Sequence, residues 1–528
     1  MFWTVAACFL IIFLYWKIIS RYNHWSKKGI SQTPYGFIWG DIWPLMFRKC
    51  SFGEMLQSLY QDHPKLRYIG LFFFLDPILL VTDLDLIKQI TTKHFDHFLD
   101  HKDTFPENTF LTENIFGQKG SKWRKMRSTL SPLFTSSKMR YMFSLISKTG
   151  EQLVEHFSQK NEDLVVVEIK EAFTKIANDV IASVTFGCDC NSLEDPRNDF
   201  YIMSKNIMEE GMFRTVRFFG YLAAPKLYDF FKISPFSLNA IEYFDDLVRD
   251  TVKLREKHNI VRPDMLNILL EARKNGLKYE ESHNEDTAFA TVQESEIHKR
   301  KLDKVDITDE EIASQGFGFF FAGYEAVSST MAFMSYELAV NSDIQARLIE
   351  EVDTTRNSCD DQITYEALNS MKYMDMVVSE TLRKWPQNVV INRICNKPFT
   401  IEPKYPDEKP LVLEKDTVLW IPLFAVLRDP KFFPDPEKFD PERFSLENRK
   451  NIVQGSFIPF GSGPRNCIGS RLAILETKAV FYHLLCQFEV VPVEKTQIPI
   501  QMRKGKMPVI ADKGVWVGLK RRFEKIHS

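Results

Sequence analysis

Residues 457–469 read Phe-Ile-Pro-Phe-Gly-Ser-Gly-Pro-Arg-Asn-Cys-Ile-Gly. The three glycines allow the backbone to pass close to a large flat ligand, because a glycine has no Cβ to obstruct it. Cys467 precedes an apolar helical run over residues 470–488, and the N–H groups and dipole of a helix start favour a thiolate. A thiolate is a good soft ligand for iron. The stretch therefore predicts iron ligation by Cys467, and the alternative is a buried cysteine behind an ordinary glycine-rich turn.

The spacing Phe460-x-x-Gly463-x-Arg465-x-Cys467-x-Gly469 resembles the haem-binding loop of the cytochrome P-450 family, the haem-thiolate monooxygenases. These five matching positions favour the family over the ordinary turn. The resemblance implies a haem b cofactor with Cys467 as its axial thiolate ligand. It also implies that Phe460, Arg465 and Gly469 lie against the cofactor.

Length and composition exclude several other classes of protein. At 528 residues the chain is too long for one small core, so two lobes or an unusually large domain are expected. A net charge of −2 gives no reason to expect a nucleic-acid partner. Among the eight cysteines only Cys188 and Cys190 are close in sequence, so neither a zinc site nor a disulfide framework is predicted. This pattern favours a reducing, cytosol-facing compartment.

The N-terminus predicts a membrane anchor. Residues 1–16 carry no charge, and with Lys17 snorkelling the apolar run reaches the ~20 residues that a bilayer span needs. The positive charges that follow place the bulk of the chain on the cytoplasmic side. The alternative is a buried helix. We therefore divide the chain into an anchor over 1–20, a linker over 21–50 and a catalytic domain over 51–528, on the cytoplasmic side of the endoplasmic reticulum membrane.

Apolar periodicity predicts a helix-rich middle with small β elements at both ends. Strands are expected over 66–74 and 78–82 across an Asp76-Pro77 turn, with helices over 139–186, 199–257 and 365–384. Thr308 and Glu311 form a capping box that opens a long apolar helix ending near Val340. We expect a mainly α fold with small β-sheets, in the α+β class. The resemblance implies a P-450-like fold whose long central helix crosses the haem.

Two motifs far apart in sequence have a structural interpretation by resemblance. Glu380 and Arg383 lie on one helical face, which alone indicates only an ordinary ion pair. The family resemblance implies that Arg443, in Pro-Glu-Arg-Phe, completes a buried triad that braces the loop before Cys467. A buried carboxylate between two arginines is stable only as a fully paired network.

Haem carries two propionates, and burying them requires cations or other donors. The positions that match the family are Trp123, Arg127, Arg393 and Arg465. The neighbouring basic side chains at 122, 124 and 125 would offer a positive surface to an acidic redox partner, or form a simple solvated face.

The long helix departs from the family at one position. The family usually has an acidic residue followed by a threonine, whose hydroxyl helps to organise the waters that supply protons. Glu325 matches the acidic position, but Ala326 has no hydroxyl, and Ser329 lies about one turn, or ~4.5 Å, further along. Three hypotheses follow: a substrate hydroxyl or a water replaces the threonine, the enzyme releases more peroxide, or it rearranges an oxygenated substrate without dioxygen.

The substrate pocket is predicted by resemblance to be apolar and aromatic. It would be lined by the loop 101–119, by the turn 507–509, and by Phe317, Phe319, Phe321, Ala322, Val389 and Val390. Plain core packing is the alternative for the phenylalanine run. Such a cavity suits a lipophilic substrate held by shape.

The resemblance covers nearly the whole chain and is closest to the microsomal, insect detoxification-type branch. It implies monooxygenation of a lipophilic compound with electrons from NADPH, delivered by a membrane-bound NADPH–cytochrome reductase, with cytochrome b5 as a further candidate donor. The rivals are an isomerase or dehydratase acting on oxygenated substrates, and a haem-thiolate protein that binds ligands without turnover.

Overall fold

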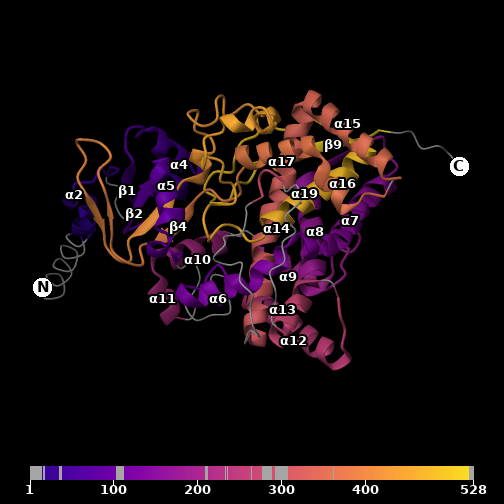
Figure 1. Ribbon diagram of the computed structural model, residues 1–528, viewed down its shortest axis with the longest axis horizontal. Coiled ribbons are helices and arrows are strands. Elements are labelled where there is room, and N and C mark those ends of the chain that lie inside the picture. The colour runs from indigo at the N-terminus through magenta and orange to yellow at the C-terminus, as the bar shows by residue number, and fades with distance from the viewer. Residues whose placement is uncertain are drawn as a thin grey trace, which may run out of the picture.

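A four-stranded sheet lies at one end of the molecule, at the left of Figure 1. Its strand order is β1 (Tyr68–Phe73), β2 (Asp76–Val81), β7 (Val418–Ile421) and β4 (Ile391–Ile394). The structure is a computed structural model that describes residues 15, 18–34, 39–102, 112–208, 212–231, 233–234, 236–262, 264–275, 288–291, 307–360 and 362–522. The sheet joins two segments that are far apart in the sequence, because β2 pairs in parallel with β7.

Two smaller sheets complete the β structure of the described residues. One has the order β3 (Leu164–Glu168), β9 (Trp516–Arg521) and β8 (Phe488–Val491), and the other pairs β5 (Phe399–Ile401) with β6 (Leu411–Leu413). β9 pairs with both of its neighbours in antiparallel register. This pairing fixes the C-terminal part of the chain beside helices formed much earlier.

The first hairpin turns earlier than the sequence predicts. The turn was expected at Asp76 and Pro77, but both belong to β2, where Asp76 pairs with Phe73. The reversal occurs at Phe74, which has a φ of 54°. The strand can accept Pro77 because it lies near the start of β2, where the loss of one N–H donor is tolerated.

Helices make up most of the regular structure in the described residues and fill the other end of the molecule (Figure 1). Four short helices lie on the sheet side: α2 (His24–Lys27), α3 (Trp43–Met46), α4 (Phe52–Gln61) and α5 (Leu84–Lys88). A fifth short helix, α18 (Leu423–Val426), packs against α4. The helical lobe contains α6 (Gly120–Leu130), α7 (Ser136–Gln159), α8 (Ile169–Ile181), α9 (Asp199–Met208), α10 (Met212–Ala223), α11 (Pro225–Phe230), α12 (Leu238–His258), α13 (Met265–Asn275), α14 (Asp309–Val340), α15 (Ser342–Ser358), α16 (Tyr365–Ser370), α17 (Lys372–Lys384) and α19 (Ser470–Gln487). A mainly α protein with small sheets is therefore confirmed.

α14 runs through the middle of the helical lobe, as the sequence predicts. Its capping box is present: the Thr308 side chain accepts from the Glu311 N–H, and the Glu311 carboxylate accepts from the Thr308 N–H. The helix has 32 residues, and most of those beyond its first turn are buried. It packs against α8, α12, α17 and α19, so its position is set from several sides.

The single helix expected over 365–384 is two helices. α16 ends at Ser370, and Met371 has an extended ψ of 98° before α17 begins. The carboxylate of Glu351 on α15 accepts hydrogen bonds from the backbone N–H groups of Tyr373 and Met374, both at 2.8 Å. An acceptor from another helix therefore caps α17 at a point that local periodicity cannot reveal.

The described part of the segment predicted as a linker packs into the sheet lobe. Trp25 is fully buried, its indole N–H donates to the Leu71 carbonyl at 3.1 Å, and its ring fills the space beside Gly70. Ile42 and Leu45 are also buried. Apolar burial, rather than sequence position, makes the described residues between 18 and 50 part of the folded unit.

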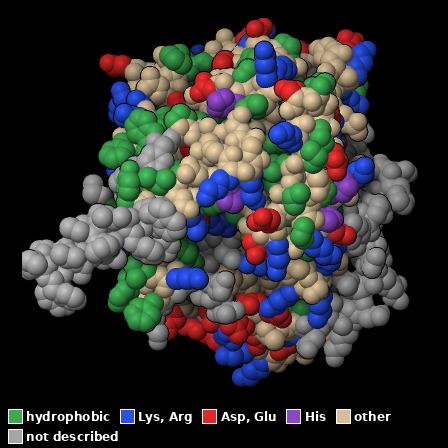
Figure 2. Space-filling model, turned by 90° about the vertical axis from the view of Figure 1, so that its left-hand side faces the viewer, with side chains coloured by type: hydrophobic (Ala, Val, Ile, Leu, Met, Phe, Trp, Pro, Cys, Tyr) green, Lys and Arg blue, Asp and Glu red, His purple; other side chains and the backbone are tan. Residues whose placement is uncertain are grey.

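The predicted anchor depends on residues 1–14, 16 and 17, which lie outside the described residues. In the described part of the chain, no helix combines the length and apolarity needed to cross a bilayer. Figure 2 shows the sheet end of the molecule, where apolar side chains gather along one edge and charges of both signs are mixed elsewhere. This mixture agrees with the small net charge of −2.

Candidate functional site

The loop that carries Cys467 is held in a conformation that requires glycine. Gly461 and Gly463 have φ values of 78° and 77°. A Cβ on Gly463 would lie 1.7 Å from the Thr91 carbonyl oxygen, which is closer than two non-bonded atoms can approach. The Cys467 N–H donates to the Phe460 carbonyl at 2.9 Å and closes the loop. The Cys467 side chain is exposed at the end of this loop, just before α19.

A partly exposed face of α14 lies near this loop. Ala322 is exposed and Phe319 and Ala326 are half-buried, although the helix is otherwise packed. Phe134 connects the two parts: its ring lies 5.8 Å from that of Phe319, and its Cε1 would contact a Cβ on Gly469 at 3.8 Å. The exposed thiol and the exposed apolar helix face are therefore close neighbours across Phe134.

Buried cations gather beside the loop. Arg465 donates to the carbonyl oxygens of Leu99 at 3.0 Å and Gln118 at 2.5 Å, and its guanidinium carbon lies 4.4 Å from the centre of the Trp123 ring. Arg127 donates to the backbone carbonyl and the side-chain oxygen of Asn466, at 2.8 and 2.7 Å. These contacts attach α6 to the two residues that precede Cys467.

Arg393 on β4 belongs to the same cluster and is incompletely bonded. Its Nη1 donates to the Asn392 carbonyl at 2.9 Å, but its buried Nε has no hydrogen-bond acceptor. Burial lowers the pKa of Arg393 to about 10. Burial and the charge of Arg393 also lower the pKa of Arg465 well below its usual value. Arg393 makes no ion pair in the described part of the chain, and the nearest carboxylate to Arg465 is Asp100, at 3.7 Å.

His101 is a member of this cluster that the sequence did not reveal. Its Nδ1 lies 2.9 Å from the Asn392 carbonyl and 3.2 Å from Arg393 Nη1, and its ring stacks on Phe116. Burial and the charges of Arg393 and Arg465 lower the pKa of His101 well below its ordinary value, so the ring is neutral. Its main contacts are 291 residues away, and no local pattern marks it.

The donor set fits the cofactor that the sequence implies. Buried guanidinium groups with one distant carboxylate and an unpaired Nε are costly unless an anion accompanies them. Two propionates would supply that anion. The exposed thiol of Cys467 and the exposed Ala322 of α14 are surfaces that a bound flat group would cover. Trp123, Arg127, Arg393 and Arg465 lie together beside the cysteine loop, and their contact with propionates stays a prediction.

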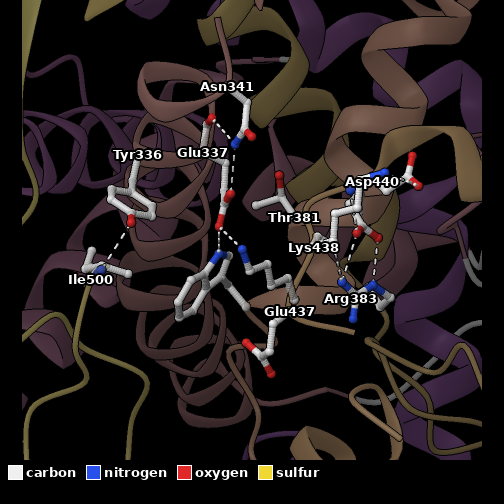
Figure 3. Close-up of polar contacts among 12 residues, drawn as sticks. Tyr336, Glu337, Asn341, Thr381, Arg383, Glu437, Lys438, Asp440 and Ile500 are labelled. Carbon is white, nitrogen blue, oxygen red and sulfur yellow. Dashed lines mark hydrogen bonds and ion pairs between the residues drawn. The ribbon is translucent and has the colours of Figure 1, made fainter. Parts of the chain in front are cut away.

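Glu380, Arg383 and Arg443 come together at the end of α17. Arg383 donates from Nε and Nη2 to the two carboxylate oxygens of Glu380, at 2.7 and 2.8 Å, and both side chains are fully buried. Arg443 Nε lies 3.4 Å from Glu380 Oε1, and the Asp440 N–H donates to the same oxygen at 2.9 Å. Figure 3 shows how Arg383 also reaches the backbone at Lys438, at 3.4 Å. The network fastens α17 to the chain segment that leads to the cysteine loop.

Glu325 has a hydroxyl partner despite Ala326. The Ser329 hydroxyl donates to Glu325 Oε1 at 2.8 Å. Lys170 Nζ, from α8, lies 3.1 Å from the same oxygen. The Glu325 side chain therefore reaches the hydroxyl of Ser329, although that residue lies one helical turn further along α14.

The predicted pocket residues fall into two environments. Phe317 is 1% exposed, and its ring centre lies 6.0 Å from that of Phe244. This packing supports the alternative that Phe317 belongs to the core, because its ring is enclosed by other helices. Phe321 is half-buried, 6.0 Å from Phe236.

Val389 and Val390 belong to an apolar cluster that joins the two lobes. Val389 is buried and Val390 half-buried, and the cluster also contains Phe219 of α10 and Val509 and Met507 of the C-terminal turn. Val389 and Val390 therefore lie in the same cluster as residues of the turn 507–509, which was also predicted to line the pocket. Residues 103–111 of the predicted pocket loop lie outside the described residues.

Comparison with known proteins agrees with this site. The cytochrome P450 family matches residues 41–516. Cytochrome P450 9e2 of Blattella germanica is 40% identical, with 98% of each chain covered. Probable cytochrome P450 9f2 of Drosophila melanogaster is 37% identical over 99% of this chain and all of that one, and cytochrome P450 6j1 of Blattella germanica is 34% identical, over 98% of this chain and 97% of that one. With the exposed thiol beside its glycine loop and the buried cations around it, the chain belongs to the cytochrome P450 family, the monooxygenases that bind haem b through a cysteine thiolate.

Proposed function

We propose that this protein is a membrane-anchored monooxygenase that inserts one oxygen atom of O2 into a lipophilic small molecule. The second oxygen atom leaves as water, and NADPH supplies the two electrons. The single observation that carries the proposal is the placement of the exposed Cys467 close to the partly exposed, apolar face of α14. A thiolate on one side and an apolar wall on the other suit a haem with a lipophilic molecule above it.

The chain supplies the ligand and the anchoring groups. Cys467 is the axial ligand, and Phe460 and Gly469 shape the loop on either side of it. Trp123, Arg127, Arg393 and Arg465 hold the propionates together with the neutral ring of His101. When bound, haem supplies the oxidative chemistry, and the protein contributes ligation, orientation and the exclusion of water.

The class of substrate follows from the side chains around this site. Phe319, Phe321 and Ala322 of α14 form one wall, and Val389 and Val390 contribute another. An aromatic and aliphatic lining selects substrates by shape and apolarity, such as xenobiotics or endogenous lipids and hormones.

Electrons come from a membrane-bound NADPH–cytochrome reductase, with cytochrome b5 as a further donor. The apolar run over 1–16 supports a single N-terminal anchor in the lipid of the endoplasmic reticulum, with the bulk of the chain on the cytoplasmic side. The insect relatives are all P450s of nearly the same length, which supports a shared arrangement.

The test uses the purified full-length protein with a panel of lipophilic compounds. A change in the Soret spectrum on addition of a compound identifies a ligand, and product is then measured with and without reductase and NADPH. Product that requires both supports the proposal. Product formed without either would identify an isomerase or dehydratase, and ligand binding without any product would identify a sequestering protein.

The Cys467→Ser variant tests the ligand. The ferrous carbon-monoxide complex of the unaltered protein should show the red-shifted Soret band of thiolate ligation, and the variant should lose it. Retention of that band in Cys467→Ser would refute the assignment of the ligand.

A further inference from the structure

Between the end of α13 and Ile307, the structure describes only the turn 288–291, Ala-Phe-Ala-Thr. This turn is closed by the Thr291 N–H, which donates to the Ala288 carbonyl at 2.9 Å. Ala290 is buried and Phe289 is half-buried, although the sequence on both sides of the turn is polar and charged. Ordering such a segment costs conformational entropy, so the contacts of the turn must offset that cost.

Phe289 completes an aromatic cluster with Phe444 and Phe457. Its ring stacks on that of Phe457, with the centres 5.5 Å apart and 27° between the ring planes, and lies 5.4 Å from that of Phe444. The rings of Phe444 and Phe457 are 4.7 Å apart. Aromatic pairs at such distances attract one another beyond their apolar burial. Phe457 is the first residue of the cysteine loop, 457–469, so the turn contacts the start of that loop directly.

A carboxylate of α17 fixes the backbone of the same turn. The Phe289 N–H donates to Asp375 Oδ2 at 2.9 Å. Asp375 Oδ1 lies 3.7 Å from Nζ of Lys478, a fully buried lysine of α19. A hydrogen bond to a carboxylate is stronger than one between neutral groups, and a buried ammonium requires a counter-charge. Because α19 begins immediately after the cysteine loop, Asp375 connects the turn to the helix at the other end of that loop.

The turn 288–291 is therefore connected to the chain on both sides of Cys467, through Phe457 before it and through α19 after it. Within the loop, the Cys467 N–H donates to the Phe460 carbonyl at 2.9 Å. The direction of the sulfur depends on this loop geometry, which both ends of the loop must maintain. In metal sites, groups beyond the ligand orient it, and their loss typically costs about 10–100-fold in affinity or activity.

We propose that the turn 288–291 is a positioning element for the iron ligand. Phe289 holds Phe457, and with it the cysteine loop, in the conformation that keeps the Cys467 sulfur on the iron as a thiolate. The inference rests on the assignment of Cys467 as the ligand under the proposed function. It gives a function to a segment that is remote in sequence from the cysteine, and Phe289 is a positioning residue because it acts through Phe457.

The test uses the full-length, haem-loaded protein and the variants Phe289→Ala and Phe289→Leu. The ferrous carbon-monoxide complex is kept in a fixed urea concentration below the unfolding transition, and the decay of its red-shifted Soret band is followed. We expect the band to decay roughly tenfold faster in Phe289→Ala, because two aromatic contacts beside the loop are lost. Phe289→Leu keeps an apolar side chain of similar size, so its band should decay only about threefold faster.

A second measurement does not use the spectrum of the cofactor. Hydrogen exchange of the peptides that cover residues 457–469 is read by mass spectrometry, and it should be roughly tenfold faster in Phe289→Ala. The matched control is Phe157→Ala, which removes a fully buried ring near the C-terminal end of α7 that packs on His156 and Lys160. This control lowers the overall stability, and it should leave the exchange of 457–469 and the Soret band unchanged.

A cycle of single and double variants tests whether the effect passes through Phe457. If it does, adding Phe289→Ala to Phe457→Ala should speed the decay of the band by less than about twofold, because the contact is already lost. Effects of the two substitutions that multiply would instead be independent, and they would refute the inference.

The outcomes separate this inference from the assignment of the ligand. If Phe289→Ala matches Phe157→Ala in band decay and in the exchange of residues 457–469, the inference is refuted. If Phe289→Ala binds no haem, Phe289→Leu decides, and decay at the rate of the unaltered protein refutes the inference. If Cys467→Ser keeps the red-shifted band, the ligand assignment fails. The exchange of residues 457–469 then decides by itself whether Phe289 positions the loop.

Discussion

Arg393 should destabilise the cofactor-free protein and stabilise the loaded one. Burial lowers the pKa of Arg393 from 12.5 to about 10, and the side chain is 1% exposed. At ~1.4 kcal/mol per pKa unit, keeping the guanidinium charged costs about 3 kcal/mol in the cofactor-free fold. Arg393→Met relieves this cost but loses the hydrogen bond to Asn392, worth about 1 kcal/mol. The net gain is about 2 kcal/mol.

The assay compares the two states of the same protein. For a chain of this length, about 2 kcal/mol raises the melting temperature of cofactor-free Arg393→Met by ~2 °C. In the loaded protein the same substitution removes a propionate partner. Haem should then transfer to an excess of an apo-globin acceptor ~10²-fold faster, because the ion pair between Arg393 and a propionate, worth about 3 kcal/mol, is lost.

Arg428→Met is the matched control. Burial also lowers the pKa of Arg428 to about 10, but its guanidinium donates to the Lys384 carbonyl and lies 4.1 Å from the centre of the Phe424 ring. Its loss should change the melting temperature of both forms by the same amount and leave haem transfer unchanged. Cofactor-free Arg393→Met that melts below the unaltered protein, or transfers haem at the same rate, would refute the reasoning.

Three further substitutions test the buried network of Glu380, the buried His483 and the glycine of the cysteine loop. Glu380→Gln leaves Arg383 facing a neutral amide, so the free energy of unfolding should fall by about 3–5 kcal/mol; a loss below ~1 kcal/mol, measured by denaturant titration, would contradict the buried network. Burial lowers the pKa of His483 to about 4, so the folded state binds fewer protons than the unfolded state between about pH 6.5 and 4. The free energy of unfolding therefore decreases as the pH is lowered through that window. His483→Gln should abolish about 2 kcal/mol of the loss between pH 7.5 and 5, and an unchanged pH profile of melting would disprove this. Gly463→Ala should prevent haem incorporation, because its Cβ would overlap the Thr91 carbonyl; normal haem content per protein would show that the loop can relax.

Much of the fold was predictable because its signals are local. The capping box at Thr308 and Glu311 and the apolar length of α14 are properties of neighbouring residues. The break at Met371 was not predictable, because the carboxylate that caps α17 comes from Glu351 on another helix. The burial of Trp25 likewise depends on Gly70, far along the chain.

The sequence by itself determined the chemistry of this protein: one cysteine in a glycine loop, a carboxylate in the central helix, and arginines spaced as in the cytochrome P450 family. These properties lie in residue type and spacing, which need no folding to be recognised. Only the tertiary structure decided that His101 joins the cations and that Ser329 and Lys170 meet Glu325. The reason is physical: a buried charge takes its partners from whatever elements packing brings to it, and Lys170 reaches Glu325 only because α8 packs on α14.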